Sequence, residues 1–397
     1  MDKIWLSSPH MGGNEINYVN EAFQTNWIAP LGPNVNGFEE DISNFIKVES
    51  TETQINISTA ALTSGTAALH LALVMLGTNE NDVVIVQSFT FCGTTNPVEY
   101  QKAKIAFVDS ELDTWNMDPN CVREAISDLL NMGYGIEGKV ESKLGLGYIR
   151  AIMPVHLYGM PAKMNELIAI STEFGIPIVE DAAEALGSRY NNQACGSFGL
   201  MAALSFNGNK IITTSGGGAL VSSQSEFIEK ARFLSTQARD NAPHYQHSQI
   251  GYNYRMSNIV AGIGRGQMEV LKQRVEQRRL NNLRYKEYFQ NIEGVSLQTE
   301  PDSNYYSNFW LTSILIDPIK TGGISRETVR LAMEKQNIEC RPLWKPMHMQ
   351  PVYDRANFYG SGVCEKLFEN GLCLPSGSNL SEDEFKRIFD VLDSIFK

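Results

Sequence analysis

The 397-residue chain has few cysteines and no long apolar run, and both absences restrict what it can be. Its six cysteines are dispersed and none forms a C-x-x-C pair, so the sequence supports neither a disulfide framework nor a zinc site. No uninterrupted apolar stretch approaches about 18 residues, and the N-terminus lacks the charged-then-apolar pattern of a signal peptide. We therefore expect reduced thiols, no metal, no membrane association and a cytoplasmic location.

Basic side chains are also scarce. The chain has 33 Lys and Arg against 45 Asp and Glu, a formal net charge of −12. Nucleic-acid-binding proteins usually present a basic face, so this balance argues against a nucleic-acid partner, although a local pocket for a small phosphorylated ligand stays possible. The three glycines at 216–218 do not fit G-x-G-x-x-G. That mismatch argues against an NAD-dependent sugar oxidoreductase.

The length predicts two domains, because a single hydrophobic core rarely grows past about 250–300 residues. Between residues 60 and 225, short apolar runs alternate with helical patterns, which is typical of an α/β fold with a mostly parallel central sheet. A long charged helix over 267–290 and the mixed patterns after it indicate a smaller α+β domain. We place the domains at 1–255 and 256–397. Expected strands are 83–86, 105–109, 148–155, 176–180, 203–206 and 219–222. Expected helices include an amphipathic helix over 60–77 and helices over 119–131 and 165–174.

Several short segments of the first domain carry residues suited to binding a phosphorylated cofactor. Residues 63–69 open the helix predicted over 60–77, where free backbone N–H groups and the helix dipole can bind a phosphate, and Gly65 allows close approach. An ordinary N-cap by Thr63 or Ser64 explains the same residues and is commoner. Ser205, at a predicted strand end, can add a hydroxyl to a phosphate site.

Three further side chains suit the rest of such a cofactor. Asp181 follows an apolar strand and can keep a heteroaromatic nitrogen protonated, although a helix N-cap fits it equally well. Lys210 stands beside two isoleucines, and apolar neighbours favour the neutral, nucleophilic amine needed for Schiff-base chemistry, although most lysines are simply on the surface. Phe91 can stack on a flat ring or belong to the core. Together with the phosphate-binding segment, these are the parts of a pyridoxal phosphate site.

At these residues the chain resembles the DegT/DnrJ/EryC1/StrS aminotransferases, the sugar-modifying branch of the fold-type I pyridoxal phosphate enzymes. The similarity runs from about Leu6 to the C-terminus. It rests on SPHMGGNE at 8–15, APLGPNV at 29–35, SGTAALHLAL at 64–73, VHLYGMPAKM at 155–164, EDAAEALGS at 180–188, SFNGNKIITTSGGG at 205–218, GYNYRMSN at 251–258 and RPLWKPMH at 341–348. The resemblance implies the aspartate-aminotransferase-like fold, with residues 1–255 as the pyridoxal phosphate domain, including an N-terminal arm that contacts substrate.

The resemblance also implies a role for individual residues. Lys210 would form the internal Schiff base, Asp181 would pair with the pyridine nitrogen, and Phe91 would stack on the ring. Asn253 would reach the cofactor phosphate of a neighbouring subunit, which implies a homodimer with shared active sites. Gly65, Thr66 and Ser205 would hold the phosphate, Arg255 and His348 would meet the substrate diphosphate, and Glu184 would lie near the cofactor's O3′ oxygen, where many relatives have Gln or His.

The implied reaction is transfer of the amino group of L-glutamate, through pyridoxamine phosphate, to C4 of a nucleotide-linked 4-keto-6-deoxy sugar for bacterial surface polysaccharides such as lipopolysaccharide. Within the family, the chain resembles the subgroup that makes UDP-N-acetylbacillosamine from UDP-2-acetamido-2,6-dideoxy-4-keto-glucose. A dTDP- or GDP-linked sugar stays open. The related dehydratases have His in place of the Schiff-base lysine, so Lys210 argues against that activity. The complete set of Lys210, Asp181 and Ser205 argues against a non-catalytic regulator.

Overall fold

The computed structural model of the protein describes residues 2–50, 55–143 and 145–397. At its centre a large sheet has the strand order β1-β9-β8-β5-β4-β2-β3-β14, with β4 and β5 joined by isolated bridges. Every neighbouring pair is parallel except the two made by β9. The strands are β1 (Ser58–Leu62), β2 (Val83–Gln87), β3 (Lys104–Val108), β4 (Ile149–Met153), β5 (Val179–Asp181), β8 (Met201–Ser205), β9 (Gly218–Ser222) and β14 (Asn357–Tyr359). The predicted mostly parallel sheet is confirmed.

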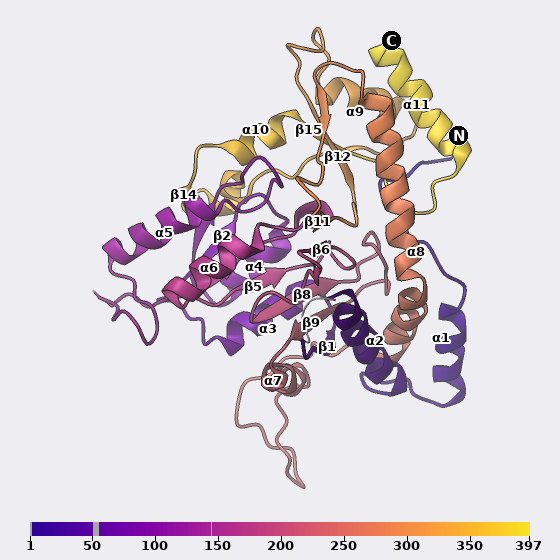
Figure 1. Ribbon diagram of the computed structural model, residues 1–397. Coiled ribbons are helices and arrows are strands. Elements are labelled where there is room, and N and C mark those ends of the chain that lie inside the picture. Colours follow the sequence, from indigo (N-terminus) through magenta and orange to yellow (C-terminus); the bar gives the residue numbers. More distant parts are fainter. Residues whose placement is uncertain (1, 51–54, 144) are drawn as a thin grey trace.

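Helices cover both faces of this sheet, which explains why its strands are continuous apolar runs. Along β2, Val84 and Val86 pack toward α3 and α7, whereas Val83 and Ile85 pack toward α5 and α6. Figure 1 shows α5 and α6 together on one side of the sheet and α7 below it. The helices of this part are α1 (Glu15–Gln24), α2 (Pro33–Glu49), α3 (Gly65–Met75), α4 (Cys92–Tyr100), α5 (Pro119–Met132), α6 (Met164–Phe174) and α7 (Ser225–Ser235).

The predicted helix over 60–77 is wrong at its beginning and in its amphipathic character. Residues 58–62 form β1, antiparallel to β9, and the helix starts only at Gly65 after the cap at Ser64. The helix is buried nearly all round, with Leu69, Leu71 and Leu73 all at most 2 % exposed. A short apolar run reads alike as a buried strand or a buried helix, so its periodicity could not separate β1 from α3.

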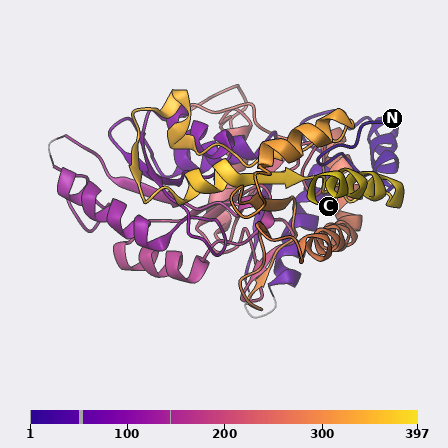
Figure 2. The ribbon, with the colours of Figure 1, turned by 90° about the horizontal axis from the view of Figure 1, so that it is seen from above.

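A second sheet with the order β10-β12-β15-β13 forms the core of the smaller C-terminal part. The 32-residue helix α8 (Asn258–Phe289) connects the two sheets, and it begins nine residues before the helix predicted over 267–290. The N-terminal segment lies against the C-terminal helix on this part, where Arg387 donates to the backbone oxygen of Asp2 (Figures 1 and 2). Its elements are β10 (Val295–Leu297), β12 (Thr312–Ile316), α9 (Arg326–Lys335), β13 (Arg341–Pro342), α10 (Val363–Asn370), β15 (Gly371–Leu374) and α11 (Glu382–Phe396).

Two segments cross between the two parts. Near the N-terminus, Ile4 pairs with Ile338 beside the C-terminal sheet. In the other direction, β14, which lies between β13 and α10 in the chain, pairs with β3 of the large sheet. A third, small sheet joins β6 (Arg189–Tyr190) and β7 (Gln193–Ala194) to β11 (Tyr305–Tyr306). The boundary between residues 255 and 256 stays a prediction, and it falls just before α8 begins. Among the described residues, no helix is both long and apolar enough to cross a bilayer.

Candidate functional site

Most of the predicted site residues line one cavity of about 610 Å³. The cavity lies where the N-termini of α3 and α4 meet the carboxyl ends of β5 and β8, and this is where open α/β sheets bind ligands. Its other side is closed by Trp5 of the N-terminal arm and by Trp310 and Trp344, which flank strands β12 and β13 of the C-terminal sheet. The predicted residues that line it are Gly65, Thr66, Phe91, Asp181, Glu184, Ser205 and Lys210.

One end of the cavity is shaped for a phosphate group. Ser64 caps α3 by accepting the N–H of Ala67 at 3.0 Å, which leaves the first-turn amides of Gly65 and Thr66 without intrahelical acceptors. A Cβ added at Gly65 would lie 3.2 Å from the Cβ of Ser205, at the end of β8. The cap and the phosphate site, competing interpretations of the sequence, thus coexist: Ser64 is the cap, and the next two residues face the cavity with Ser205.

Asp181 presents a carboxylate held by two donors. Its Oδ2 accepts the hydroxyl of Thr94 at 2.6 Å, and its Oδ1 accepts the N–H of Ala183 at 3.1 Å. Thr90 lies 2.7 Å from the Thr94 hydroxyl and must donate to it, because the Thr94 proton is already given to Asp181. Both oxygens are thus oriented by hydrogen-bond donors, and a carboxylate held in this way can pair with a protonated ring nitrogen.

Lys210 lies beside a second carboxylate and an aromatic ring. Its Nζ is 3.1 Å from Oε1 of Glu184 and 4.2 Å from the centre of the Trp310 ring. Burial raises the pKa of Glu184 to about 7, although the Lys210 charge and the N–H of Tyr158 oppose the rise. Near neutral pH Glu184 is therefore present in both its protonated and its ionised form beside the Lys210 amine. Such a lysine is suited to Schiff-base formation and to proton transfer.

Phe91 belongs to the site rather than to the core. It is the N-cap residue of α4, lines the cavity and is 57 % exposed. Its ring centre lies 5.6 Å from that of Trp344. An exposed aromatic face on a cavity wall can stack on a flat ring.

Three predicted residues lie outside this cavity in the single chain. Arg255 donates to Glu39 and to the backbone oxygen of Ala61. His348 lies 2.7 Å from Ser88 Oγ and 3.2 Å from Glu365 Oε1, with its ring stacked on a phenylalanine. Asn253 is exposed.

The structure adds two residues that the sequence did not reveal. Thr94 donates to Asp181, which lies 87 residues further along the chain. Trp310, which contacts Lys210, follows α8 in the chain, whereas Lys210 precedes it. Thr94 could have been suspected, because it follows the candidate Phe91 in the first turn of the next helix. No local pattern marks Trp310.

The fold and the site together define an α/β enzyme of the fold-type I pyridoxal phosphate class. A lysine, an acid at a strand end and a helix start surround one cavity, and this set of residues fits the cofactor. The DegT/DnrJ/EryC1/StrS aminotransferase family matches the chain over residues 9–393, so the chain belongs to this family. The fold, the cofactor pyridoxal phosphate and the transferase class predicted above are thereby confirmed.

Individual relatives cover nearly the whole chain. The chain is 48 % identical over 398 residues to "Putative pyridoxal phosphate-dependent aminotransferase EpsN" of Bacillus subtilis, and the match covers 99 % of this chain and 96 % of that protein. It is 32 % identical to "GDP-perosamine synthase" of Escherichia coli O157:H7, covering 100 % and 99 %. A crystal structure of a DegT/DnrJ/EryC1/StrS aminotransferase from Brucella abortus superimposes with a TM-score of 0.83 at 26 % identity, covering 96 % of this chain and 95 % of that one.

Proposed function

We propose that this protein transfers the amino group of L-glutamate to C4 of a nucleotide-linked 4-keto-6-deoxy sugar. The observation that carries the proposal is the pairing of Lys210 with Glu184 at 3.1 Å in the cavity that Asp181 also lines. Aminotransfer needs a lysine that binds the cofactor and, once released, moves a proton at the reacting carbon. Glu184, with its raised pKa, lies within proton-exchange distance of that lysine.

The residues divide the work as follows. Pyridoxal phosphate, when bound, would supply an electron sink for the reacting carbon. Lys210 Nζ attaches the cofactor and moves the proton, and Glu184 Oε1 receives that proton or returns it. Asp181 orients the cofactor and keeps its ring nitrogen protonated, while Thr94 fixes the Asp181 carboxylate. The amides of Gly65 and Thr66 and the hydroxyl of Ser205 bind the phosphate, and Phe91 covers the ring.

The proposed substrate is UDP-2-acetamido-2,6-dideoxy-4-keto-glucose, on the basis of the segments that resemble the bacillosamine-forming subgroup. A relative named GDP-perosamine synthase, 32 % identical over the whole chain, favours a GDP-linked 4-keto-6-deoxy sugar as the second candidate. In either case we propose a cytoplasmic homodimer. Asn253, exposed in the single chain, would reach the cofactor phosphate of the partner, and Arg255 and His348 would meet the substrate diphosphate.

The deciding experiment is a coupled assay with L-glutamate and a panel of UDP-, dTDP- and GDP-linked 4-keto-6-deoxy sugars. We expect the highest kcat/KM with the UDP 2-acetamido sugar. Turnover of only the GDP or dTDP sugar would replace the substrate and keep the reaction. Glutamate alone must also convert the cofactor of the loaded enzyme to its amino form, detected by loss of the visible absorbance. An enzyme whose cofactor is untouched by glutamate is not the proposed aminotransferase.

A further inference from the structure

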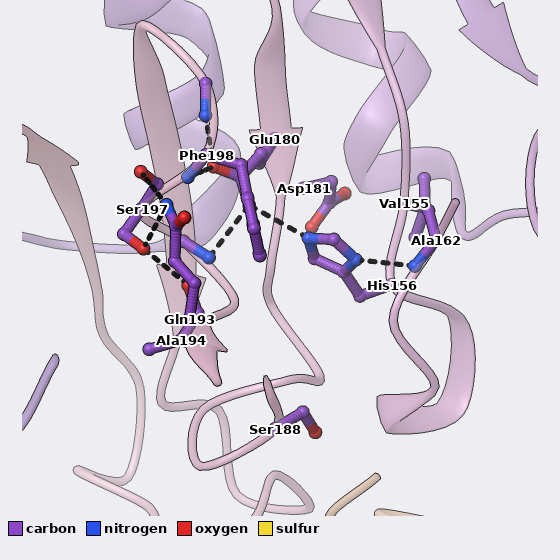
Figure 3. A network of polar contacts seen from close by, with 12 residues as sticks. Val155, His156, Ala162, Glu180, Asp181, Ser188, Gln193, Ala194, Ser197 and Phe198 are labelled. Atoms are coloured by element: carbon purple, nitrogen blue, oxygen red, sulfur yellow. Dashed lines mark hydrogen bonds and ion pairs between the residues drawn. The ribbon is translucent and has the colours of Figure 1, made fainter. Parts of the chain in front are cut away.

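Behind the cavity, on the opposite face of β5, lies a buried carboxylate that the proposed chemistry does not use. Successive side chains of a strand point to opposite faces, so Glu180 points away from the cavity lined by Asp181. Glu180 is fully buried, and its two oxygens have four hydrogen-bond partners (Figure 3). These are the N–H groups of Gly196 at 2.8 Å, Phe198 at 2.7 Å and Gly199 at 2.6 Å, and Nε2 of His156 at 2.9 Å.

The protonation of His156 follows from its two hydrogen bonds. Its Nδ1 accepts the N–H of Ala162 at 3.0 Å, so the ring proton is on Nε2 and points at Glu180. Burial lowers the pKa of His156, but Cys195 and Glu180 outweigh burial and raise it to about 10, which on charge alone would favour a doubly protonated ring. The geometry at Nδ1 opposes that second proton. A second ring proton would sit at Nδ1, facing the N–H of Ala162. The pair is therefore a neutral imidazole donating to a carboxylate, with every donor and acceptor used.

Through the main chain, this pair is joined to Asp181. The N–H of His156 donates to the backbone oxygen of Asp181 at 3.1 Å, and the N–H of Asp181 donates to that of Pro154 at 2.9 Å. The carboxyl ends of β4 and β5 are thus tied together at the residue that orients the cofactor. Glu180, the neighbour of Asp181 in the chain, holds the same strand end from the opposite face.

The other nitrogen of His156 is joined to Glu184. By accepting from Ala162, Nδ1 closes the turn over residues 156–162, which includes the single-turn 3₁₀ helix η1 (Leu157–Gly159). Within it Tyr158 has a φ of +56°, a conformation that non-glycine residues adopt only when their surroundings impose it. In that conformation its N–H donates to Glu184 Oε2 at 2.7 Å. The turn thereby holds the carboxylate that faces Lys210.

We propose that His156 and Glu180 are positioning residues that set the two carboxylates of the site. One imidazole does both. Its Nε2 bonds Glu180, the chain neighbour of Asp181, and its Nδ1 bonds the turn that holds Glu184. The inference rests on the proposed function for its catalytic consequence, but its geometry is testable without a sugar substrate. Neither residue touches the cavity, so both act through their neighbours.

The first test concerns the tautomer and needs no activity. The chain has six histidines, so ¹⁵N-histidine labelling gives six imidazoles, and His156→Asn identifies the signal of His156. In the cofactor-loaded protein we expect one protonated nitrogen, Nε2, unchanged between pH 6 and 9. A doubly protonated ring, or a proton on Nδ1, would overturn the inference.

The second test is Glu180→Gln in the cofactor-loaded enzyme. All four partners of Glu180 are donors, so the NH₂ group of the glutamine must face a donor. A change of the His156 tautomer would offer it an acceptor at Nε2, but would turn Nδ1–H against the N–H of Ala162. We expect a shifted visible absorption and circular dichroism spectrum of the bound cofactor. We also expect kcat to fall about 10- to 100-fold, as for displacements of about 1 Å at a site, while KM for the sugar stays within about twofold.

Gln193→Ala is the matched control. Gln193 holds the same loop through Ser197, but it bonds neither Glu180 nor His156, so we expect an unchanged cofactor spectrum. An equal spectral shift in this variant, or a wild-type spectrum and kcat for Glu180→Gln, would overturn the inference. If Glu180→Gln fails to fold, His156→Gln and His156→Asn replace it. Each variant is expected to keep one of the two side-chain hydrogen bonds of His156, either to Glu180 or to the N–H of Ala162. A wild-type cofactor spectrum in both variants would again overturn the inference, whichever sugar is the substrate.

Discussion

Two buried cation–carboxylate pairs of this protein look alike and behave differently. Lys210 with Glu184 lines the cavity, whereas Arg255 with Glu39 lies outside it, and all four side chains are at most 12 % exposed. Glu39 also accepts the N–H of Ala61 and a second arginine, and Arg255 also donates to the Ala61 oxygen. Among the described residues, Glu184 has only two donors, Lys210 and the N–H of Tyr158. Removing one partner of the outer pair would leave a buried charge uncompensated, whereas the cavity pair contains a carboxylate whose pKa is raised to about 7.

Breaking the cavity pair at the lysine should have the largest effect. Lys210→Arg keeps the positive charge beside Glu184 but cannot give up its proton, so it can neither attach the cofactor covalently nor transfer a proton. We expect turnover to fall by about 10³-fold or more with an unchanged far-UV circular dichroism spectrum. The visible absorbance of the bound cofactor should also be lost. An active Lys210→Arg enzyme would contradict the assignment of Lys210.

Breaking the outer pair should cost stability. Arg255→Ala leaves Glu39 buried with fewer donors, and we expect the free energy of unfolding in urea to fall by about 3 kcal/mol. Arg255→Lys, which keeps one charge, should lose less. KM measured on the folded variant tests the proposed contact with the substrate diphosphate. A rise of about tenfold would support that contact, and an unchanged KM would leave Arg255 a purely structural role.

The pH dependence of the free energy of unfolding should report on Glu184. Burial raises the pKa of Glu184 from 4.5 to about 7, so the native state binds more protons than the unfolded state between these values. Stability from this group is therefore present below pH 4.5 and lost as the pH rises through 7, by about 1–3 kcal/mol. We expect Glu184→Gln to remove this loss, measured by urea unfolding of the cofactor-free protein at pH 5 and pH 8. An equal loss in wild type and variant would show that Glu184 is ionised throughout.

The smallest effect should come from the exposed wall of the cavity. Phe91→Ala removes a stacking face but no charge, and we expect the cofactor to bind about 3- to 10-fold more weakly, as measured by fluorescence titration. Phe91→Trp should bind as well as wild type, because it keeps the aromatic face. Equal affinity for all three proteins would remove Phe91 from the cofactor site.

Much of the fold was predictable because most of its strands are continuous apolar runs separated by helical segments. Residues 83–86 and 219–222 were expected as strands and lie in β2 and β9. The boundary between β1 and α3 was not, since both are apolar and buried and only pairing with β9 distinguishes them. In the site, Asp181 and Ser205 were predictable because each directly ends a strand.

The rest of the site depends on contacts between distant segments. Trp310 reaches Lys210 from beyond α8, and Thr94 reaches Asp181 across 87 residues. The VHLYG and EDAAEA segments are visible in the sequence as separate motifs. Their interaction through His156 and Glu180 appears only when β4 and β5 lie side by side.

The chemical inventory of this protein can be read from its sequence: a lysine, acids at strand ends and a glycine-containing helix start, all in the order of an α/β domain. Which of its charged side chains line the cavity depends on the three-dimensional arrangement. Ion pairing and hydrogen bonding depend on the distance between atoms and on the exclusion of water, and spacing along the chain specifies neither. The sequence marked Lys210 as the Schiff-base lysine and Arg255 as a substrate contact, but it did not show that Lys210 lies beside Glu184 in the cavity and Arg255 beside Glu39 outside it.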